Sequence, residues 1–208
     1  MSFRLKLLPL SIFFSAMCAF SGCKSVTGVF SENELLVIHA GGTGIMRLYT
    51  VDNPADSVLL RSKSAAVQEE MLTSPDFSLL VNRMLATVND PDNEGVGIAA
   101  PQVGILRRII AVQRFDKEGE PFEVYVNPEI VFYSGNKISG IEGCLSVPGM
   151  RGRVARAAEI TLRYRDSKTF EEREETVSGY TAVIFQHETD HLNGRLYTDI
   201  ASETESVQ

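Results

Sequence analysis

Residues 179–192 read GYTAVIFQHETDHL, and we expect this stretch to form the central helix of the fold. Ser178 can cap its beginning, and Asn193 followed by Gly194 can end it. Short runs rich in β-forming residues precede it, separated by Gly, Pro, Asn and Asp. These expected strands cover residues 107–115, 122–126, 138–146, 159–165 and 171–177.

An earlier helix is expected where Ser74, Pro75 and Asp76 form a helix start. Apolar residues then recur at helical spacing until the turn cluster at residues 90–93. The order of helix, strands and helix predicts an α+β domain. In this domain, mainly antiparallel sheets pack around the central helix, which carries the pattern H-E-x-x-H.

That pattern, at residues 187–191, is the strongest chemical signal in the chain. Residues four apart share one helical face, so His187 and His191 can present two imidazoles to one metal ion, with Glu188 close by. The structural alternative is a solvated helix face. Two of the chain's three histidines fall in this motif, which favours the metal site.

A catalytic metal needs a third protein ligand and an open position for water. Downstream, Tyr197 stands where one H-E-x-x-H class has another histidine, and Glu203 and Glu205 lie in a polar tail. We therefore expect the ligand upstream, and Cys144 in the segment EGCLS is the candidate. A lone cysteine is more often a buried small hydrophobe. A Cys-His-His set, however, suits Fe²⁺, Zn²⁺, Ni²⁺ or Co²⁺.

A third segment, GVGIAAPQ, occupies residues 95–102. It is a weak phosphate loop, because it follows a polar turn and opens no convincing helix. As a tight turn, it would let the backbone approach a substrate closely and would place the Gln102 amide at its end. Taken alone, the segment is better explained as a structural glycine loop.

Together, the segments GVGIAAPQ, EGCLS and QHETDH resemble the three signature motifs of the peptide deformylase family in order and spacing. The resemblance extends from Val51 to Tyr197 and includes residues 126–128, Val-Asn-Pro. It implies an enzyme that removes the formyl group from the N-terminal formyl-methionine of newly synthesised proteins, releasing formate.

The resemblance also implies the roles of individual residues. One divalent metal ion, with Fe²⁺ expected, would be held by Cys144, His187 and His191. Glu188 would act as general acid and base toward the water that attacks the formyl carbon, as its place beside a ligand also suggests.

Further residues are expected to bind the substrate and its oxyanion. The resemblance gives oxyanion stabilisation to the Gln102 side chain and the Leu145 N–H, with Gly97 shaping the loop beside them. It also gives Arg151 a part in holding the peptide backbone. An apolar pocket for methionine is expected on the helical face of His187, and ordinary core packing is the alternative. Its expected lining residues are Val96, Val183 and Ile184.

Composition limits the partners. A chain of 208 residues, 44% of them hydrophobic, can bury the core of one domain. Its net charge of −7 is a poor match for phosphate backbones, so we expect no direct nucleic-acid binding. The expected partners are formyl-methionyl nascent peptides, and the family resemblance suggests a monomer. The sequence has no clear counterpart after Ile200 of a C-terminal helix used for ribosome docking, so only transient ribosome proximity is expected.

The N-terminal segment has a different character. Residues 1–24 look like a bacterial lipoprotein signal in which Cys23 becomes lipidated. Residues 25–45 read as a linker or as sequence that does not fold. We therefore expect residues 1–45 to be signal-like or non-native and residues 46–208 to form the catalytic domain. The predicted enzyme begins at Met46 in the cytoplasm, and the alternative is an envelope protein anchored through Cys23.

Two other functions compete with this hypothesis. A zinc peptidase of the H-E-x-x-H type is disfavoured because the downstream ligand is missing. A lipid-anchored binding protein that keeps the fold without turnover is disfavoured because all expected ligands and Glu188 are present.

Overall fold

The computed structural model describes residues 29–207, so the expected signal segment and Cys23 lie outside the described residues. The helices are α1 (Glu32–His39), α2 (Pro54–Leu60), α3 (Glu69–Leu72), α4 (Pro75–Val88) and α5 (Gly179–Leu192), with 3-10 turns η1 (Ala100–Val103) and η2 (Tyr197–Asp199). The strands are β1 (Gly97–Ala99), β2 (Ile109–Gln113), β3 (Phe122–Tyr133), β4 (Lys137–Cys144), β5 (Val147–Ala157), β6 (Glu159–Asp166), β7 (Glu172–Ser178) and β8 (Glu203–Ser206).

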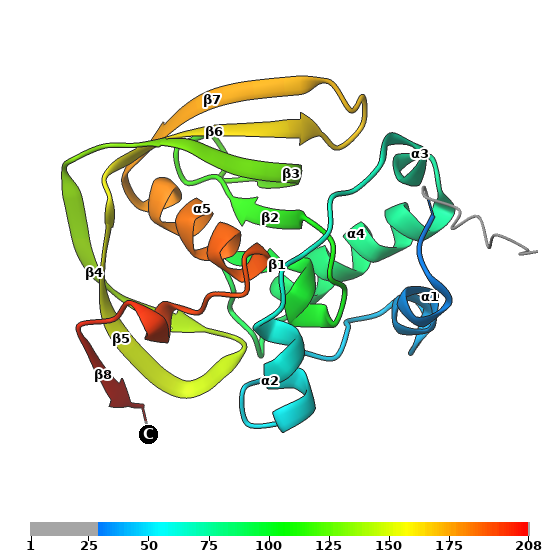
Figure 1. Cartoon of the computed structure of the whole chain (residues 1–208), viewed down its shortest axis with the longest axis horizontal. Coiled ribbons are helices and arrows are strands. Elements are labelled where there is room, and N and C mark those ends of the chain that lie inside the picture. Colours follow the sequence, from blue (N-terminus) through cyan, green and yellow to red (C-terminus); the bar gives the residue numbers. More distant parts are fainter. Residues whose placement is uncertain (1–28, 208) are drawn as a thin grey trace, which may run out of the picture.

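The strands form two antiparallel sheets on either side of α5 (Figure 1). The larger sheet has the order β1-β2-β3-β6-β7, and the smaller has the order β4-β5-β8. Helix α5 contacts strands of both sheets, including β2 of the larger and β5 of the smaller. The predicted α+β class with a central helix is therefore confirmed.

Helix α5 has the predicted bounds and is buried on most sides. The Gln186 side chain ties it to β5: its oxygen accepts from the Ala157 N–H at 2.9 Å, and its amide donates to the Ala157 carbonyl at 2.9 Å. The predicted cap is wrong in detail, because the Ser178 hydroxyl donates to Glu159 at 3.0 Å and makes no capping bond to the helix. Asn193 and Gly194, whose φ is +71°, end the helix as expected.

Helix α4 also begins as predicted, with the Ser74 hydroxyl accepting from the Asp76 N–H. Its apolar residues are buried in the core, and its last residue, Val88, lies against the glycine loop at residues 95–102. A Cβ at Gly95 would lie 2.7 Å from Val88, so only glycine lets that loop pass so close to α4.

Some elements differ from the sequence-based expectation. Strand β5 starts at Val147, directly after the strand expected at residues 138–146, because the chain turns back into a hairpin with β4. The polar tail forms β8, which pairs with β5 in the register Arg151 to Glu205. Within residues 29–207, no helix has the length and apolar character needed to cross a lipid bilayer.

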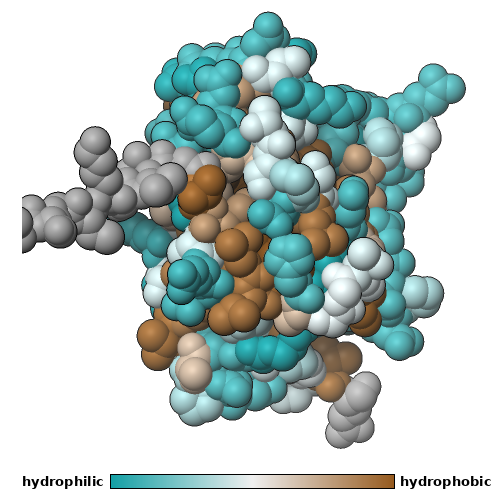
Figure 2. All heavy atoms as spheres, turned by 90° about the vertical axis from the view of Figure 1, so that its right-hand side faces the viewer, coloured by the Kyte–Doolittle hydropathy of each residue, from teal (hydrophilic) through white to brown (hydrophobic). Residues whose placement is uncertain are grey.

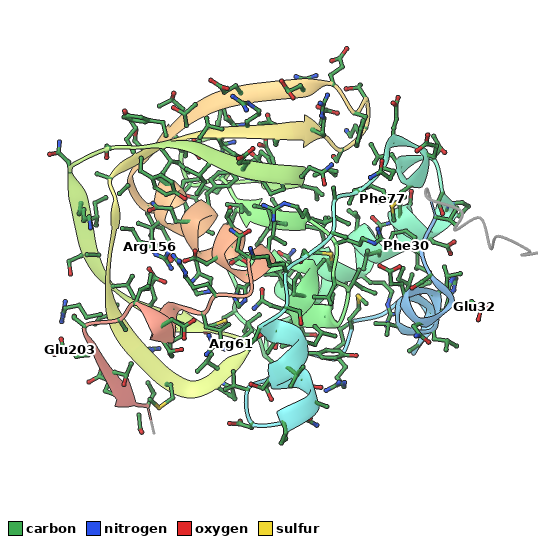
Figure 3. The ribbon with its side chains drawn as sticks, viewed as in Figure 1. Phe30, Glu32, Arg61, Phe77, Arg156 and Glu203 are labelled. Carbon is green, nitrogen blue, oxygen red and sulfur yellow. The ribbon has the colours of Figure 1, made fainter. Side chains whose placement is uncertain are left out.

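The prediction that the segment before Met46 does not fold is wrong for residues 29–45. Ser31 and Glu34 form a capping box at the start of α1. Phe30 and Ile38 are buried in the same core cluster as Phe77 of α4 (Figure 3). The segment therefore contributes apolar side chains to the core of the domain.

Polar contacts fix this N-terminal arm, residues 29–45, to the rest of the domain. The Arg83 side chain of α4, 1% exposed, donates to the carbonyls of Ile38, Gly44 and Ile45 at 2.6, 2.8 and 3.0 Å. Glu34 forms a bidentate ion pair with Arg107. Figure 2 turns this side of the molecule toward the viewer and shows apolar atoms in the middle of the face, framed by hydrophilic ones.

A chain that begins at Met46 should therefore be less stable than one that begins at Val29. Losing the burial of Phe30 and Ile38 costs about 1.5–3 kcal/mol for each side chain, which lowers the melting temperature by roughly 10 °C. Thermal unfolding of the two chains measures this difference in melting temperature. Ile38→Ala in the longer chain removes part of the same buried contact and should cause a smaller decrease. Equal melting temperatures would show that the arm adds nothing to stability.

Candidate metal centre

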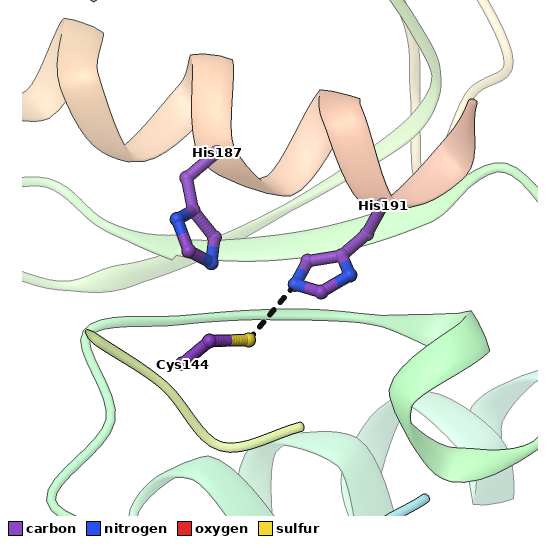
Figure 4. Close-up of side chains that lie close together, drawn as sticks. All are labelled: Cys144, His187 and His191. Carbon is purple, nitrogen blue, oxygen red and sulfur yellow. Dashed lines mark hydrogen bonds between the residues drawn. The ribbon is translucent and has the colours of Figure 1, made fainter. Parts of the chain in front are cut away.

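Three potential metal ligands meet between α5 and the end of β4 (Figure 4). His187 and His191 lie one turn apart on α5, and Cys144 is the last residue of β4. Their ligand atoms all lie within 4.8 Å of one another, and Cys144 Sγ is 3.2 Å from His191 Nε2. The structure thus brings together the three residues that the sequence proposed as ligands.

The pairing of β4 with β5 is irregular at Cys144, because residues 148–150 of β5 have no partner in β4. The register shifts between Gly143, which pairs with Arg151, and Cys144, which pairs with Val147. A bulge of this kind re-aims a side chain at the end of a strand. The Ser146 N–H then donates to Sγ at 3.4 Å.

The electrostatics favour a thiolate at Cys144. Burial alone would raise the pKa of this thiol, but the neighbouring His191 and His187 imidazoles lower the pKa well below its usual range. A thiolate beside two imidazoles is a donor set suited to Fe²⁺, Zn²⁺, Ni²⁺ or Co²⁺. The residues present therefore fit a single divalent transition metal.

Glu142 and Arg156 are two residues of the site that the sequence analysis missed. Glu142 lies 2.9 Å from His187 Nδ1, which leaves Nε2 of that ring to face the other ligands. Arg156 of β5, labelled in Figure 3, donates to both Glu142 oxygens at 2.8 and 3.0 Å. Burial would raise the pKa of Glu142, but its bonds to His187 and Arg156 lower that pKa to about 2. The carboxylate therefore stays charged and fixes the orientation of the imidazole.

Glu188 is 4% exposed and lies against the glycine loop. A Cβ at Gly97 would lie only 2.5 Å from Glu188 Oε1, so a side chain there would displace the carboxylate. Burial raises the pKa of Glu188 to about 7. A carboxyl group with such a pKa can both accept and release a proton near neutral pH.

Gln102 presents its amide to the same centre. The side chain is buried, and its oxygen accepts from the Ala99 N–H at 2.8 Å, which fixes the amide. Its Nε2 donates to Cys144 Sγ at 3.6 Å. The glycine loop thus places a hydrogen-bond donor beside the ligands.

A cavity of about 760 Å³ opens onto these groups. Its lining includes Val96, Arg151, Val183 and Ile184, the residues that the sequence proposed for substrate binding, as well as Leu145. The other expected functional residues in its wall are Gly97, Gln102, Cys144, His187 and Glu188. The cavity is large enough for several residues of an extended peptide.

Other ligands considered in the sequence are not in the cluster. Glu203 of β8 pairs with Arg153 at 2.7 Å, and the tail carboxylates are not part of the ligand group. Tyr197 instead stacks its ring on His187, with ring centroids 6.1 Å apart and an interplanar angle of 20°. Neither Tyr197 nor the tail carboxylates can therefore act as the downstream metal ligand that a zinc peptidase of the H-E-x-x-H type would need.

Comparison with known proteins gives the same picture over most of the chain. The family model described as polypeptide deformylase matches residues 45–207. The chain belongs to this family. It is therefore an enzyme of the peptide deformylase type, as the three sequence motifs predicted.

Individual relatives agree with this family assignment. The chain is 37% identical over 167 residues to the peptide deformylase of Leptospira biflexa, covering 77% of this chain and 89% of the relative. It is 38% identical over 143 residues to that of Stenotrophomonas maltophilia, covering 69% and 81%.

Solved deformylase structures share the fold. The actinonin-bound class I type b peptide deformylase of Acinetobacter baumannii superposes with a TM-score of 0.67 at 36% identity, covering 76% of this chain and 99% of that one. The peptide deformylase of Thermotoga maritima gives 0.66 at 32% identity, covering 76% and 99%.

Proposed function

We propose that this chain hydrolyses the formyl group from the N-terminal formyl-methionine of newly synthesised proteins, releasing formate and a free amine. The observation that carries the proposal is the Cys144, His187 and His191 cluster with buried Glu188 in the wall of a peptide-sized cavity. Family membership gives the reaction type, and the residues below give the roles.

The proposed metal ligands are Cys144, His187 and His191. A divalent ion held there supplies Lewis-acid chemistry, which makes water a nucleophile near neutral pH and polarises a carbonyl. Fe²⁺ is the expected ion from the family resemblance, and Zn²⁺, Ni²⁺ and Co²⁺ suit the same donors.

Glu188 is proposed as the general acid and base. Its carboxylate takes a proton from the attacking water and later delivers it to the leaving amine. The absence of a side chain at Gly97 allows the carboxylate to occupy this position.

Charge that develops on the formyl oxygen requires donors that are already in place. The Gln102 amide fits this role because its bond to Ala99 holds it beside Cys144. The Leu145 N–H, from the residue after Cys144 in the cavity wall, is the proposed second donor.

The substrate lies in the cavity with its methionine side chain against Val96, Val183 and Ile184, while Arg151 holds the peptide backbone. A peptide deformylase of Acinetobacter baumannii has been solved with Met-Ala-Ser bound, at 35% identity to this chain. A peptide of that length is a suitable substrate core for this enzyme.

The direct test is formate release from formyl-Met-Ala-Ser by the purified full chain. We expect turnover that a chelator abolishes and that Fe²⁺, Co²⁺ or Ni²⁺ restores, because the three ligands bind the ion reversibly. Absence of formate release from a metal-loaded, folded sample would overturn the proposal.

The proposed cellular setting is the cytoplasm, where formylated chains emerge from ribosomes. We propose a monomer that meets nascent peptides near the ribosome without binding nucleic acid, consistent with its net charge of −7. The alternative remains an envelope protein anchored through Cys23, and N-terminal sequencing with a lipid assay of the native protein distinguishes the two.

A further inference from the structure

The wall of the cavity lacks a side chain at Gly140 of β4. Side chains alternate along a strand, so a Cβ at Gly140 would share the inner face with Ile138 and Glu142. Its partner on β5 is Val154, which is buried and lines the cavity as well. A Cβ built at Gly140 would have no atom within 4 Å. The space that this glycine leaves is therefore part of the cavity.

Neither backbone conformation nor close packing requires glycine at this position. Its φ is outside the left-handed region, whereas a Cβ at Gly97 or at Gly152 would meet a neighbour at 2.5 or 3.0 Å. A glycine inside a strand weakens the strand, because it has more backbone freedom to lose and no side chain to pack. The effect of Gly140 therefore lies in the room that it leaves for a ligand.

The cavity also has an apolar extension along α5, away from the metal ligands. Val183 lies one turn before His187, and Tyr180 lies nearly one turn further on, so the three follow one face of the helix. Tyr180 and Ile138 both line the cavity and are 56% and 39% exposed. The Tyr180 ring rests against Phe115 at a centroid distance of 5.3 Å.

We propose that Gly140 and Tyr180 determine substrate specificity by accommodating a first side chain larger than methionine. The enzyme then accepts N-formyl peptides that begin with an aromatic residue, whose ring packs against Tyr180 and enters the space beside Gly140. A tilted contact between two aromatic rings adds binding free energy beyond that from the burial of apolar area. This inference rests on the proposed deformylase function.

The test compares kcat/KM for formyl-Phe-Ala-Ser and formyl-Met-Ala-Ser in the metal-loaded full chain. We expect the wild-type values to lie within about tenfold of each other, because the space beside Gly140 and the contact with Tyr180 bury the phenyl ring about as well as the methionine side chain is buried. Gly140→Val should lower the Phe-to-Met ratio by at least about tenfold by filling the space. Tyr180→Ala should lower the same ratio by removing the aromatic contact.

Ser139→Val is the matched control, because Ser139 is exposed on the opposite face of the same strand, and it should leave the ratio unchanged. Thermal unfolding shows whether each variant is folded, and Gly140→Ala provides a smaller change if valine disrupts the strand. An unchanged ratio in folded Gly140→Val, or a wild-type rate on formyl-Phe below about a thousandth of that on formyl-Met, overturns the inference. No turnover of either peptide would instead overturn the proposed function and this inference with it.

Discussion

Glu188→Ala is expected to lower the turnover of formyl-Met-Ala-Ser by a factor between about a hundred and ten thousand. The proposed mechanism needs one group that accepts a proton from water and returns it to the leaving amine. Glu188 is the carboxylate beside the ligands that is free for this task, because Glu142 is engaged by His187 and Arg156. The metal content should stay at the wild-type level, since all three proposed ligands remain.

Glu188→Gln is the companion variant, because it keeps the shape of the side chain and removes only its acid and base function. Steady-state kinetics and metal analysis on the same samples separate proton transfer from metal binding. Wild-type turnover in either variant would show that another group moves the proton. A parallel loss of metal and activity would instead place Glu188 in metal retention.

The sequence predicted the two long helices because their signals are local. The start at Ser74 and the end at Asn193 and Gly194 are fixed by residues within a turn of each boundary. Helix α1 also has such a signal, the capping box from Ser31 to Glu34, but its short length of eight residues and the glycines near it concealed it. Strand β5 could not be predicted from local residues, because it is defined by its pairing with β4, which begins at Val147 and resumes at Arg151. Between these pairings, Gly149 has a φ of +69°, which local sequence alone reads as a turn.

In the candidate site, too, some residues follow from local sequence signals and others depend on contacts between distant parts of the chain. His187 and His191 follow from helical spacing, and Cys144 followed from the need for a third ligand. Glu142 stands two residues before that cysteine and could have been proposed as a partner for a ligand. Arg156 carries no sequence signal, because only the hairpin brings it back beside Glu142.

Cys144→Ala is expected to lose both metal and activity. The variant keeps the two imidazoles but removes the thiolate, and a site with only two histidines holds a divalent ion poorly. Even residues that merely orient a ligand change metal affinity by about ten- to a hundredfold, so removing a ligand should cost at least about a hundredfold.

Two measurements that do not depend on turnover test this expectation. Metal content after desalting should fall to background, and added Co²⁺ should no longer raise the melting temperature, because a ligand stabilises only a protein that binds it. Cys144→Ser, which keeps an oxygen donor at the same place, should fall between the wild type and Cys144→Ala. An undiminished metal content in the alanine variant would exclude Cys144 from the ligands. In that case, the Ser146 N–H and the Gln102 amide, which both donate to its sulfur, would serve a thiolate with a purely structural role.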